Sequence, residues 1–536
     1  MAKLVLPKTT SAIREAAVPV AGEIFYDSEK KMFFGGDGET VGGVPFRHAR
    51  IGTQYIYGLD TEYNASGDPV SAVQVVLDTS YDDPANPHRY QTVGAGGFTQ
   101  EPAHNFHRCL MVREAKDGGG YKLTFSKYLN ASDSRFDMNG DPVALDGSQG
   151  GVHVEIPPTY VRLDFYLDAS EHLHEVYLVS NEPFEGAVAH RRCYDGPGGA
   201  TIRTLYLGAF RSVACDGTTG LVIPQGSGAD ATPVAYNAAY RLRSIATATW
   251  TKSGSEYILN PLDPTTGARP IGNWTRARLR SGHNLEGGTN VSSFFGQWMA
   301  LMMAIDCGSW NTQSGISDGY CWRSAFAYQD LRATGRTAVF GNGTGSIIAD
   351  ETEGGVDEDL ATGWQAGKDH IVQFSWRGIE DPYGSQWCFE DGIIMYQDAS
   401  ESFDASGYWC TNDTDRYYID STHNYDRDHD PIHGAAGSTF PDVGYTGATD
   451  VWVSHAWPKA NGNVLNTSEK DFFPTKTGSG VYGDYFYASS SAGSRVVFRG
   501  GSSSNGALAG AFYVSVYLGL SNTTAYSGGR LAAFSD

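Results

Sequence analysis

A long period-two alternation of apolar and polar residues constrains the fold of this chain more than any other feature. It is clearest in "GGVHVEIPPTYVRLDFYLD" (residues 150–168), where Val152, Val154 and Ile156 share one face of an extended chain. Because proline cannot donate to a β-ladder, Pro157 and Pro158 predict a sheet edge or a bend in this run. Similar runs, such as "CLMVREAKDGGGYKLTFSKYL" and "HLHEVYLVS", recur along the chain. The pattern predicts a β-rich protein.

Composition agrees with many short strands joined by tight turns. The 536 residues include 66 glycines and 31 tyrosines, and the length is enough for two to four domains. One strong helix is predicted in "NVSSFFGQWMALMMAIDCGSW", where apolar residues recur every three or four positions and should form core: Phe294, Phe295, Trp298, Leu301, Met302 and Ile305. The fold class is therefore α+β, β-rich and multidomain.

Charge and cysteine usage exclude several classes of protein. A formal net charge of −22 argues against nucleic-acid and anionic-membrane partners, which need a basic surface. The seven cysteines are scattered, odd in number and without a C-x-x-C pair, so we expect reduced thiols: Cys109, Cys193, Cys215, Cys307, Cys321, Cys388 and Cys410. The start of the chain lacks a sustained apolar region, and no apolar run is long enough to span a membrane. We therefore expect synthesis in a host cytoplasm and no membrane insertion.

Residues 1–55 predict a small β-hairpin region. Short strand-like runs at Glu23–Tyr26 and Met32–Phe34 flank a polar turn at Asp27–Lys31. Two such strands bury too little apolar surface to be stable alone, so we expect this region to fold by association with other copies or with a neighbour.

Metal sites are only weakly indicated, so the presence of a metal stays unknown. Asp426, Asp428 and Asp430 alternate in "YDRDHDP", but the EF-hand glycine and glutamate positions are occupied by Pro431 and Gly437. A calcium loop of another kind remains an alternative to a solvated acidic loop. The segment "DMNGDP" (residues 137–142) is better explained as a turn than as a metal site. Histidines that could chelate a metal lack a catalytic zinc spacing: His104, His107, His172, His174 and His190.

No motif for catalysis is present. The chain has no G-x-S-x-G, no P-loop and no Rossmann glycine pattern. A pair of carboxylates for glycoside hydrolysis stays open, because its geometry is invisible in one sequence.

The C-terminal segment instead predicts a display surface. In "AFYVSVYLG" the alternation puts Phe512, Val514, Val516 and Leu518 on one face, and Tyr513, Ser515 and Tyr517 on the other. Tyrosine with small polar residues is the composition of a binding surface, and the same types flank the strand on both sides. An ordinary exposed strand with polar loops is the alternative.

Several blocks resemble phage receptor-binding proteins with a C-type lectin fold, in the branch related to the formylglycine-generating-enzyme domain. The matching blocks are "SWRGIEDPYGSQWCFEDGI" (375–393), Asn311, Gln313 and Ile316 after the predicted helix, "DGSQGGVHVEIPPTYVRLDF" (146–165) and Arg495–Leu531. The N-terminal "GEIFYDSEKKMFFGGDGETVGGVPF" is similar to the opening of phage tail fibres, including that of the trimeric tropism-determinant family.

The resemblance implies a virion tail-fibre or tail-tip adhesin that binds a host cell-surface receptor, protein or glycan. The implied layout is residues 1–55 for virion attachment and trimerisation, 56–145 for an intermediate β domain, and 146–536 for the C-type lectin-like receptor-binding domain. It further implies a homotrimer, contact with other tail proteins through the N-terminus, no catalytic residues and no cofactor, with calcium left open.

The resemblance also implies a variable C-terminal segment, residues 495–531, that a retroelement diversifies at adenines. The receptor-binding positions carried over are Ser503, Ser504, Asn505, Tyr513, Ser515, Tyr517, Asn522, Thr524 and Tyr526. Ser503 stands where the family commonly has Trp, and Ser527-Gly528 replaces Ile-Gly. The competing hypotheses are a glycan-degrading tail enzyme, a structural fibre or collar protein, and a sulfatase-activating oxidase. The absence of cysteine in 495–531 argues against the last.

Overall fold

The computed structural model describes the chain in separate ranges. These are residues 8–9, 24–27, 32–35, 44–45, 56–64, 69–77, 90–92, 105–184, 186–189, 203–225, 232–253, 256–259, 268–317, 331, 333–350, 370–397, 407–410, 450–455, 476–477, 485–488, 493–502, 505 and 509–535. The chain divides into two compact units, one of residues 1–54 and 78–89 and one of residues 55–77 and 90–536.

The first unit contains a four-stranded sheet, in the order β1-β2-β3-β4. Its strands are β1 (Lys8–Thr9), β2 (Ile24–Asp27), β3 (Met32–Gly35) and β4 (Val44–Pro45). β2 and β3 pair antiparallel, with Phe25 opposite Phe34, which confirms the predicted hairpin. The parallel pairing of β1 with β2 adds a strand that the sequence did not predict.

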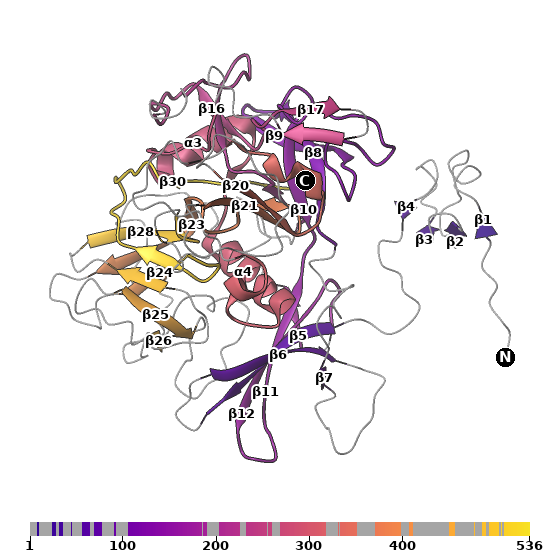
Figure 1. The fold of residues 1–536 in the computed structure, drawn as a ribbon, viewed down its shortest axis with the longest axis vertical. Coiled ribbons are helices and arrows are strands. Elements are labelled where there is room, and N and C mark those ends of the chain that lie inside the picture. Colours follow the sequence, from indigo (N-terminus) through magenta and orange to yellow (C-terminus); the bar gives the residue numbers. More distant parts are fainter. Residues whose placement is uncertain are drawn as a thin grey trace. The chain divides into compact units, whose positions relative to one another are not determined.

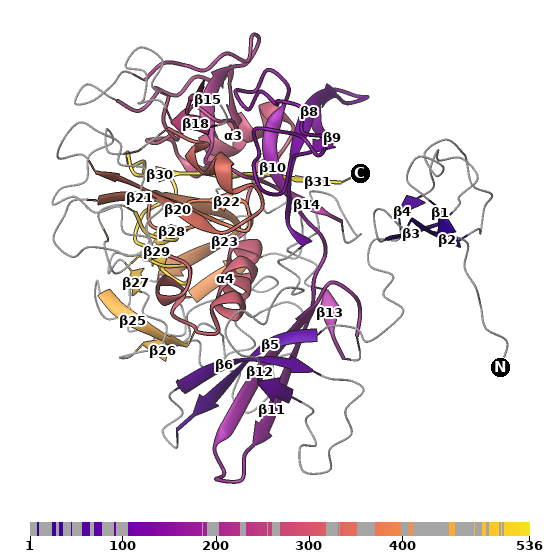
Figure 2. The ribbon, with the colours of Figure 1, turned by 45° about the vertical axis from the view of Figure 1, so that its right-hand side comes forward.

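The second unit is built around a six-stranded sheet whose strands come from distant parts of the chain (Figures 1 and 2). In spatial order they are β19 (Thr289–Asn290), β31 (Leu531–Phe534), β14 (Leu205–Gly208), β10 (Gly151–Ile156), β8 (His107–Ala115) and β9 (Tyr121–Tyr128). All six residues of β10 are buried, because the strand is central and covered on both faces. The C-terminal strand thus pairs with a strand more than three hundred residues earlier.

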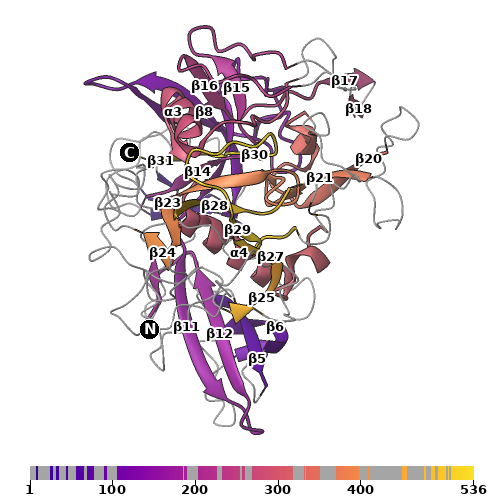
Figure 3. The same cartoon turned by 90° about the vertical axis from the view of Figure 1, so that its left-hand side faces the viewer.

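A second six-stranded sheet extends from the body of this unit, where β11 and β12 are its longest visible arms (Figure 3). Its strands in spatial order are β13 (Val188–Ala189), β11 (Tyr160–Leu167), β12 (Leu173–Ser180), β5 (Ile56–Tyr63), β6 (Pro69–Leu77) and β7 (Tyr90–Thr92). The chain crosses from one sheet to the other at Pro157-Pro158, between β10 and β11. The predicted bend is confirmed, and the alternating run is two strands in two sheets.

The expected boundary between residues 145 and 146 does not coincide with a division between sheets. β8 and β9 precede it, yet β8 pairs with β10 beyond it, from Met111 opposite Gly151 to His107 opposite Glu155. Likewise β5, before the boundary, pairs with β12 after it. Backbone pairing therefore interleaves the two expected domains.

An eight-stranded sheet and three smaller sheets complete the second unit. The eight-stranded sheet has the order β24-β23-β28-β29-β27-β25-β26, with β30 pairing β23. Its strands are β23 (Trp387–Gln397), β24 (Gly407–Cys410), β25 (Asp450–His455), β26 (Lys476–Thr477), β27 (Tyr485–Ala488), β28 (Gly493–Arg499), β29 (Val514–Val516) and β30 (Ser527–Gly528). The others are formed by β15 (Val213–Asp216) with β16 (Tyr240–Arg243), β17 (Trp250–Ser253) with β18 (Glu256–Leu259), and β20 (Gly345–Asp350) with β21 (His370–Trp376) and β22 (Ile379–Glu380).

The described residues include two α-helices, α3 (Arg276–Glu286) and α4 (Ser293–Cys307), and the 3₁₀ turns Thr312–Ser314 and Arg336–Phe340. α4 confirms the predicted core helix: Ser292 caps its first turn and left-handed Gly308 ends it. Five of the six predicted core positions are buried, and the side chain of the sixth, Phe294, lies outside the described residues: Phe295, Trp298, Leu301, Met302 and Ile305 are the buried ones. None of the described helices is both long and apolar enough to cross a membrane.

α4 joins the extended sheet to the body of the unit. Gln74 of β6 donates from its amide to the carbonyls of Ile305 (2.9 Å) and Asp306 (2.8 Å), at the C-terminal end of α4. The indole of Trp310 donates to Thr61 Oγ1 of β5 at 2.7 Å. The two Gln74 bonds add a side-chain donor to carbonyls at the end of α4, and together with the Trp310 bond they attach the sheet to the helix.

Candidate functional site

The middle of the C-terminal segment is buried, contrary to the prediction that one face of it is displayed. β29 covers only Val514–Val516, and its three residues are all buried. Tyr513 is 3 % exposed and Ser515 is 5 % exposed, so neither side chain faces solvent. The predicted outward orientation of these two residues is wrong.

The reason is that β29 lies inside a sheet with a hydrophobic cluster on each side. It pairs with β28 on one edge and β27 on the other. Phe512 packs with Trp310 at a ring distance of 5.6 Å, in the cluster that contains α4. Tyr513 packs on the opposite side, with its ring 4.6 Å from that of Trp387. The predicted separation of Phe512, Val514 and Val516 from Tyr513 is confirmed, but both faces meet core, and Leu518 packs against the Tyr513 cluster instead of the Phe512 cluster.

The residues that follow β29 do form an exposed surface. Tyr517 is 44 % exposed and Tyr526 is 36 % exposed, while Asn522 is exposed and Thr524 is half-buried between them. We call these four residues the C-terminal surface. Their composition, two tyrosines with an amide and a hydroxyl, is the composition of binding surfaces that make large contacts at low entropic cost.

Backbone hydrogen bonds hold this surface in place. The amide of Asn522 donates to the carbonyl of Gly519 at 3.1 Å, and the amide of Trp387 donates to the carbonyl of Tyr526 at 3.0 Å. The hydroxyls of Thr524 and Ser527 lie 2.7 Å apart. Because backbone hydrogen bonds hold most of this turn, the side chains at the exposed positions can differ without loss of the turn. That is the requirement for a surface that varies.

The remaining predicted positions lie beside this surface or outside the described residues. Ser503 and Ser504 fall outside the described ranges. Asn505 accepts from the backbone amide of Ser502 at 2.8 Å, and its own amide faces the hydroxyl of Tyr513 at 3.4 Å. Asn505 therefore stabilises the loop, in addition to any contact it makes.

Buried ion pairs support the sheet that contains β29, the strand before the C-terminal surface. Arg499 of β28 contacts Glu390 of β23 at 2.7 Å, and Arg280 of α3 pairs with Asp391 through two short bonds, 2.6 Å and 2.9 Å. Burial raises the pKa of Glu390 although Arg499 opposes the shift. Removing one partner of such a pair leaves an uncompensated buried charge, which costs about 3–5 kcal/mol.

One arrangement in the described residues has the connectivity of a catalytic triad. Ser212 Oγ lies 2.7 Å from His283 Nε2, and His283 Nδ1 lies 2.5 Å from Asn290 Oδ1. All three side chains are at most 2 % exposed, so no substrate reaches the hydroxyl. Burial lowers the pKa of His283 to about 4, which keeps the imidazole neutral. The geometry is that of a structural hydrogen-bond chain.

The acidic residues of the "RGIED" block are also internal. Glu380 accepts from the backbone amides of Gly335 and Thr337, each at 2.9 Å. Burial and the neighbouring Glu380 raise the pKa of Asp381 to about 7. The peptide oxygen of Asp381 accepts from Arg211 at 2.8 Å. These carboxylates are sealed in the core and cannot act on an external glycan.

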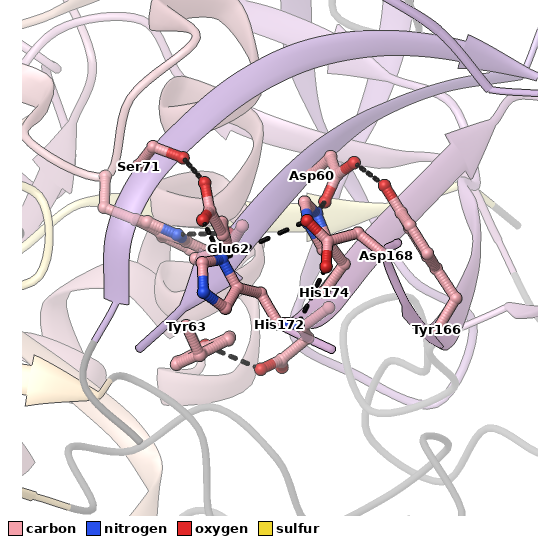
Figure 4. A network of polar contacts seen from close by, with 11 residues as sticks. Asp60, Glu62, Tyr63, Ser71, Tyr166, Asp168, His172 and His174 are labelled. Atoms are coloured by element: carbon pink, nitrogen blue, oxygen red, sulfur yellow. Dashed lines mark hydrogen bonds and ion pairs between the residues drawn. The ribbon is translucent and has the colours of Figure 1, made fainter. Parts of the chain in front are cut away.

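A second polar constellation lies on the extended sheet (Figure 4). His174 Nδ1 lies 2.9 Å from Asp60, which also accepts from the hydroxyl of Tyr166 at 2.6 Å. His172 Nδ1 lies 2.7 Å from Glu62, and this hydrogen bond is the main cause of the lowered pKa of that carboxyl. The histidines predicted to share one side of a strand do so, and each has a carboxylate partner from β5.

Metal binding finds no support in the described ranges, where no group of three or more potential ligands is placed to hold an ion. The "DMNGDP" segment is a turn, as predicted: Asp137 accepts from the backbone amides of Asn139 (2.9 Å) and Asp141 (3.1 Å). Asp426, Asp428, Asp430, His104 and His190 lie outside the described residues. The four cysteines described in full are free thiols: Cys109, Cys215, Cys307 and Cys388.

Comparisons with known proteins give a likeness only at the level of solved structures. No family model matches the chain, and no curated protein matches it. The chain is similar to the Major Tropism Determinant P3c variant, with 12% identity, 99% of each chain covered and a TM-score of 0.22. It is similar to the I1 variant of the same protein at 11% identity, with 99% of each chain covered and a TM-score of 0.24. Identity and TM-score are both low, so the functional argument rests on the residues of this chain.

Proposed function

We propose that this protein is a non-enzymatic phage adhesin that binds a host cell-surface receptor through its C-terminal surface. The observation that carries the proposal is the contrast within residues 512–526. The strand is anchored in two hydrophobic clusters, whereas Tyr517, Asn522 and Tyr526 just beyond it are exposed on a turn held by backbone bonds. A rigid support with exposed tyrosine and amide side chains is the architecture of a recognition surface.

The resemblance of the sequence blocks supports the finer parts of the proposal. They comprise a C-type lectin fold, a homotrimer, attachment to the virion tail through residues 1–55, and diversification of residues 495–531 by a retroelement. The burial of Tyr513 and Ser515 narrows the receptor contacts that we propose to Tyr517, Asn522, Thr524 and Tyr526. Asn505 stays in the proposal, as do Ser503 and Ser504, which lie outside the described residues.

Adsorption measurements test the receptor-binding proposal directly. Purified full-length protein is expected to bind host cells and to block phage adsorption. A Tyr517→Ala/Tyr526→Ala variant is expected to lose most of this binding. Tyr121→Ala is a matched control, because Tyr121 on β9 is 37 % exposed and lies on another sheet. Equal adsorption by all three proteins would exclude the C-terminal surface as the receptor contact.

Two further measurements separate the alternatives. Native mass spectrometry of a homotrimer should give three times the 57.8 kDa chain mass. Release of reducing ends from host glycan by the purified protein would identify it as an enzyme and overturn the non-enzymatic assignment. A near-identical template repeat that differs only at adenines, beside a reverse transcriptase gene, tests diversification.

A further inference from the structure

The C-terminal surface continues onto two segments that are distant in sequence. The exposed Asn273 donates its backbone amide to the carbonyl of Thr524 at 2.7 Å. Its φ of 61° is left-handed, a conformation that asparagine tolerates better than most residues. The next residue, Trp274, is buried and donates its indole N–H to the carbonyl of Val234 at 2.8 Å. The loop around Val234 and the start of α3 are thereby fixed beside the C-terminal turn.

A tyrosine and an arginine stand at this junction. Tyr236 is 37 % exposed, and the guanidinium carbon of Arg278 lies 4.8 Å from the centre of its ring. The ring of Tyr236 packs nearly perpendicular to that of Trp274, with the ring centres 5.0 Å apart. The N-terminal cap of α3 uses the hydroxyl of Thr275 and the backbone amide of Arg278, so the exposed guanidinium has no part in the cap. We call Tyr236, Asn273 and Arg278 the arginine ledge.

The charge pattern sets this region apart from the rest of the chain. The protein has 61 acidic and 39 basic residues, yet the stretches 231–255, 264–285 and 485–535 contain no Asp or Glu. These three stretches supply the arginine ledge and the C-terminal surface. An exposed arginine whose neighbours in these stretches carry no negative charge attracts an anionic group, even though the whole molecule is acidic.

Most arginines in these stretches are already committed to partners in the core. Arg280 pairs with Asp391 and Arg499 pairs with Glu390, both buried. Arg278 is exposed, and the half-buried Arg495 lies near the exposed Tyr517. Each of these two arginines therefore accompanies an exposed tyrosine. Tyrosine and arginine are the residues most enriched among the dominant contacts of protein interfaces.

We infer that the arginine ledge is the fixed half of the receptor-contact surface and binds a carboxylate-bearing patch on a protein receptor. The inference rests on the function proposed above and adds a contact outside the variable segment. A protein partner fits better than a sugar, because Arg278 lies over the ring of Tyr236 and Trp274 packs against the same ring, which leaves less of it for a sugar to stack on. Arg278 instead offers a guanidinium that pairs with Asp or Glu.

The test is binding of labelled full-length protein to host cells at low and high salt. Arg278→Glu is expected to weaken binding by about 10- to 100-fold, as for the loss and reversal of an interfacial charge contact. Binding of the wild type is expected to weaken at 0.5 M salt, where exposed charge pairs are screened. Lys116→Glu makes the same charge change at an exposed turn between β8 and β9 and should leave binding within about twofold.

The outcomes separate the ledge from the proposed function. If Arg278→Glu binds like Lys116→Glu while Tyr517→Ala/Tyr526→Ala does not bind, the ledge is overturned and the adhesin proposal stands. If all variants bind like the wild type, both fall. Binding that survives protease treatment of the cells overturns the inference that the receptor is a protein. If Arg278→Glu fails to fold, Arg278→Gln is measured in the same assay. Loss of salt-sensitive binding by Arg278→Gln supports the arginine ledge, and full binding overturns it.

Discussion

Replacing Tyr513 by alanine tests whether the C-terminal strand is a core strand or a displayed one. The side chain is 3 % exposed and its ring lies 4.6 Å from that of Trp387. Truncating a buried aromatic side chain to alanine costs about 3–5 kcal/mol. Tyr517, four positions nearer the C-terminus, is 44 % exposed, so its truncation should cost about 0.5 kcal/mol or less.

The expected shift in the midpoint of thermal unfolding follows from the size of the cooperative unit. The second unit contains about 470 residues, and an unfolding entropy of about 2.1 cal/mol/K per residue gives about 1 kcal/mol/K. A loss of 3–5 kcal/mol therefore lowers the thermal midpoint by about 3–5 °C for Tyr513→Ala, and Tyr517→Ala should change it by about 0.5 °C or less. Tyr513→Phe isolates the hydroxyl, whose bond to Asn505 is long at 3.4 Å, and should cost about 1 kcal/mol or less.

Calorimetry of the three variants measures the thermal midpoint, and intrinsic fluorescence, to which the neighbouring Trp387 contributes as one of 11 tryptophans, reports on packing. The reasoning is refuted if Tyr513→Ala and Tyr517→Ala have the same midpoint, because the two tyrosines would then share one environment. A receptor-binding defect in Tyr513→Ala at an unchanged midpoint would restore the original prediction that this residue is a direct contact.

Three further predictions concern the core and its connections. Gly296→Ala in α4 should destabilise the protein by about 3 kcal/mol or more, because the new Cβ would lie 1.9 Å from the buried Glu390 carboxylate. The loss is expected although alanine usually favours a helix, and urea unfolding measures it. Burial lowers the pKa of both His153 and His283 to about 4, so an unfolded chain binds protons near pH 6.5 that the folded chain does not. Stability should therefore fall as the pH drops from about 6.5 to about 4, and His283→Gln should show a weaker fall in calorimetry over that range. Gln74→Ala should cost about 1–3 kcal/mol, because it leaves the last carbonyls of α4 without their side-chain donor; faster hydrogen exchange at the end of α4 is the readout.

The local structure was predictable from the amino-acid sequence wherever one physical requirement acts on neighbouring residues. The three- and four-residue spacing of apolar side chains located α4, and Pro157-Pro158 located the crossing between two sheets. The spacing of polar residues in "DMNGDP" determined a turn, because Asp137 satisfies amides only two and four residues away. These features depend on contacts within a few positions, so the sequence contains all of their information.

Which side chains of the C-terminal segment reach solvent depends on long-range packing. Alternation separates Phe512 from Tyr513, but it does not say whether a second layer covers the tyrosine face. Trp387, more than a hundred residues away, covers it, while the chain beyond β29 leaves Tyr517 exposed. The approach of Asn273 to Thr524 is likewise a contact between distant segments. Period-two patterning specifies a face, and long-range packing specifies whether that face is core or surface.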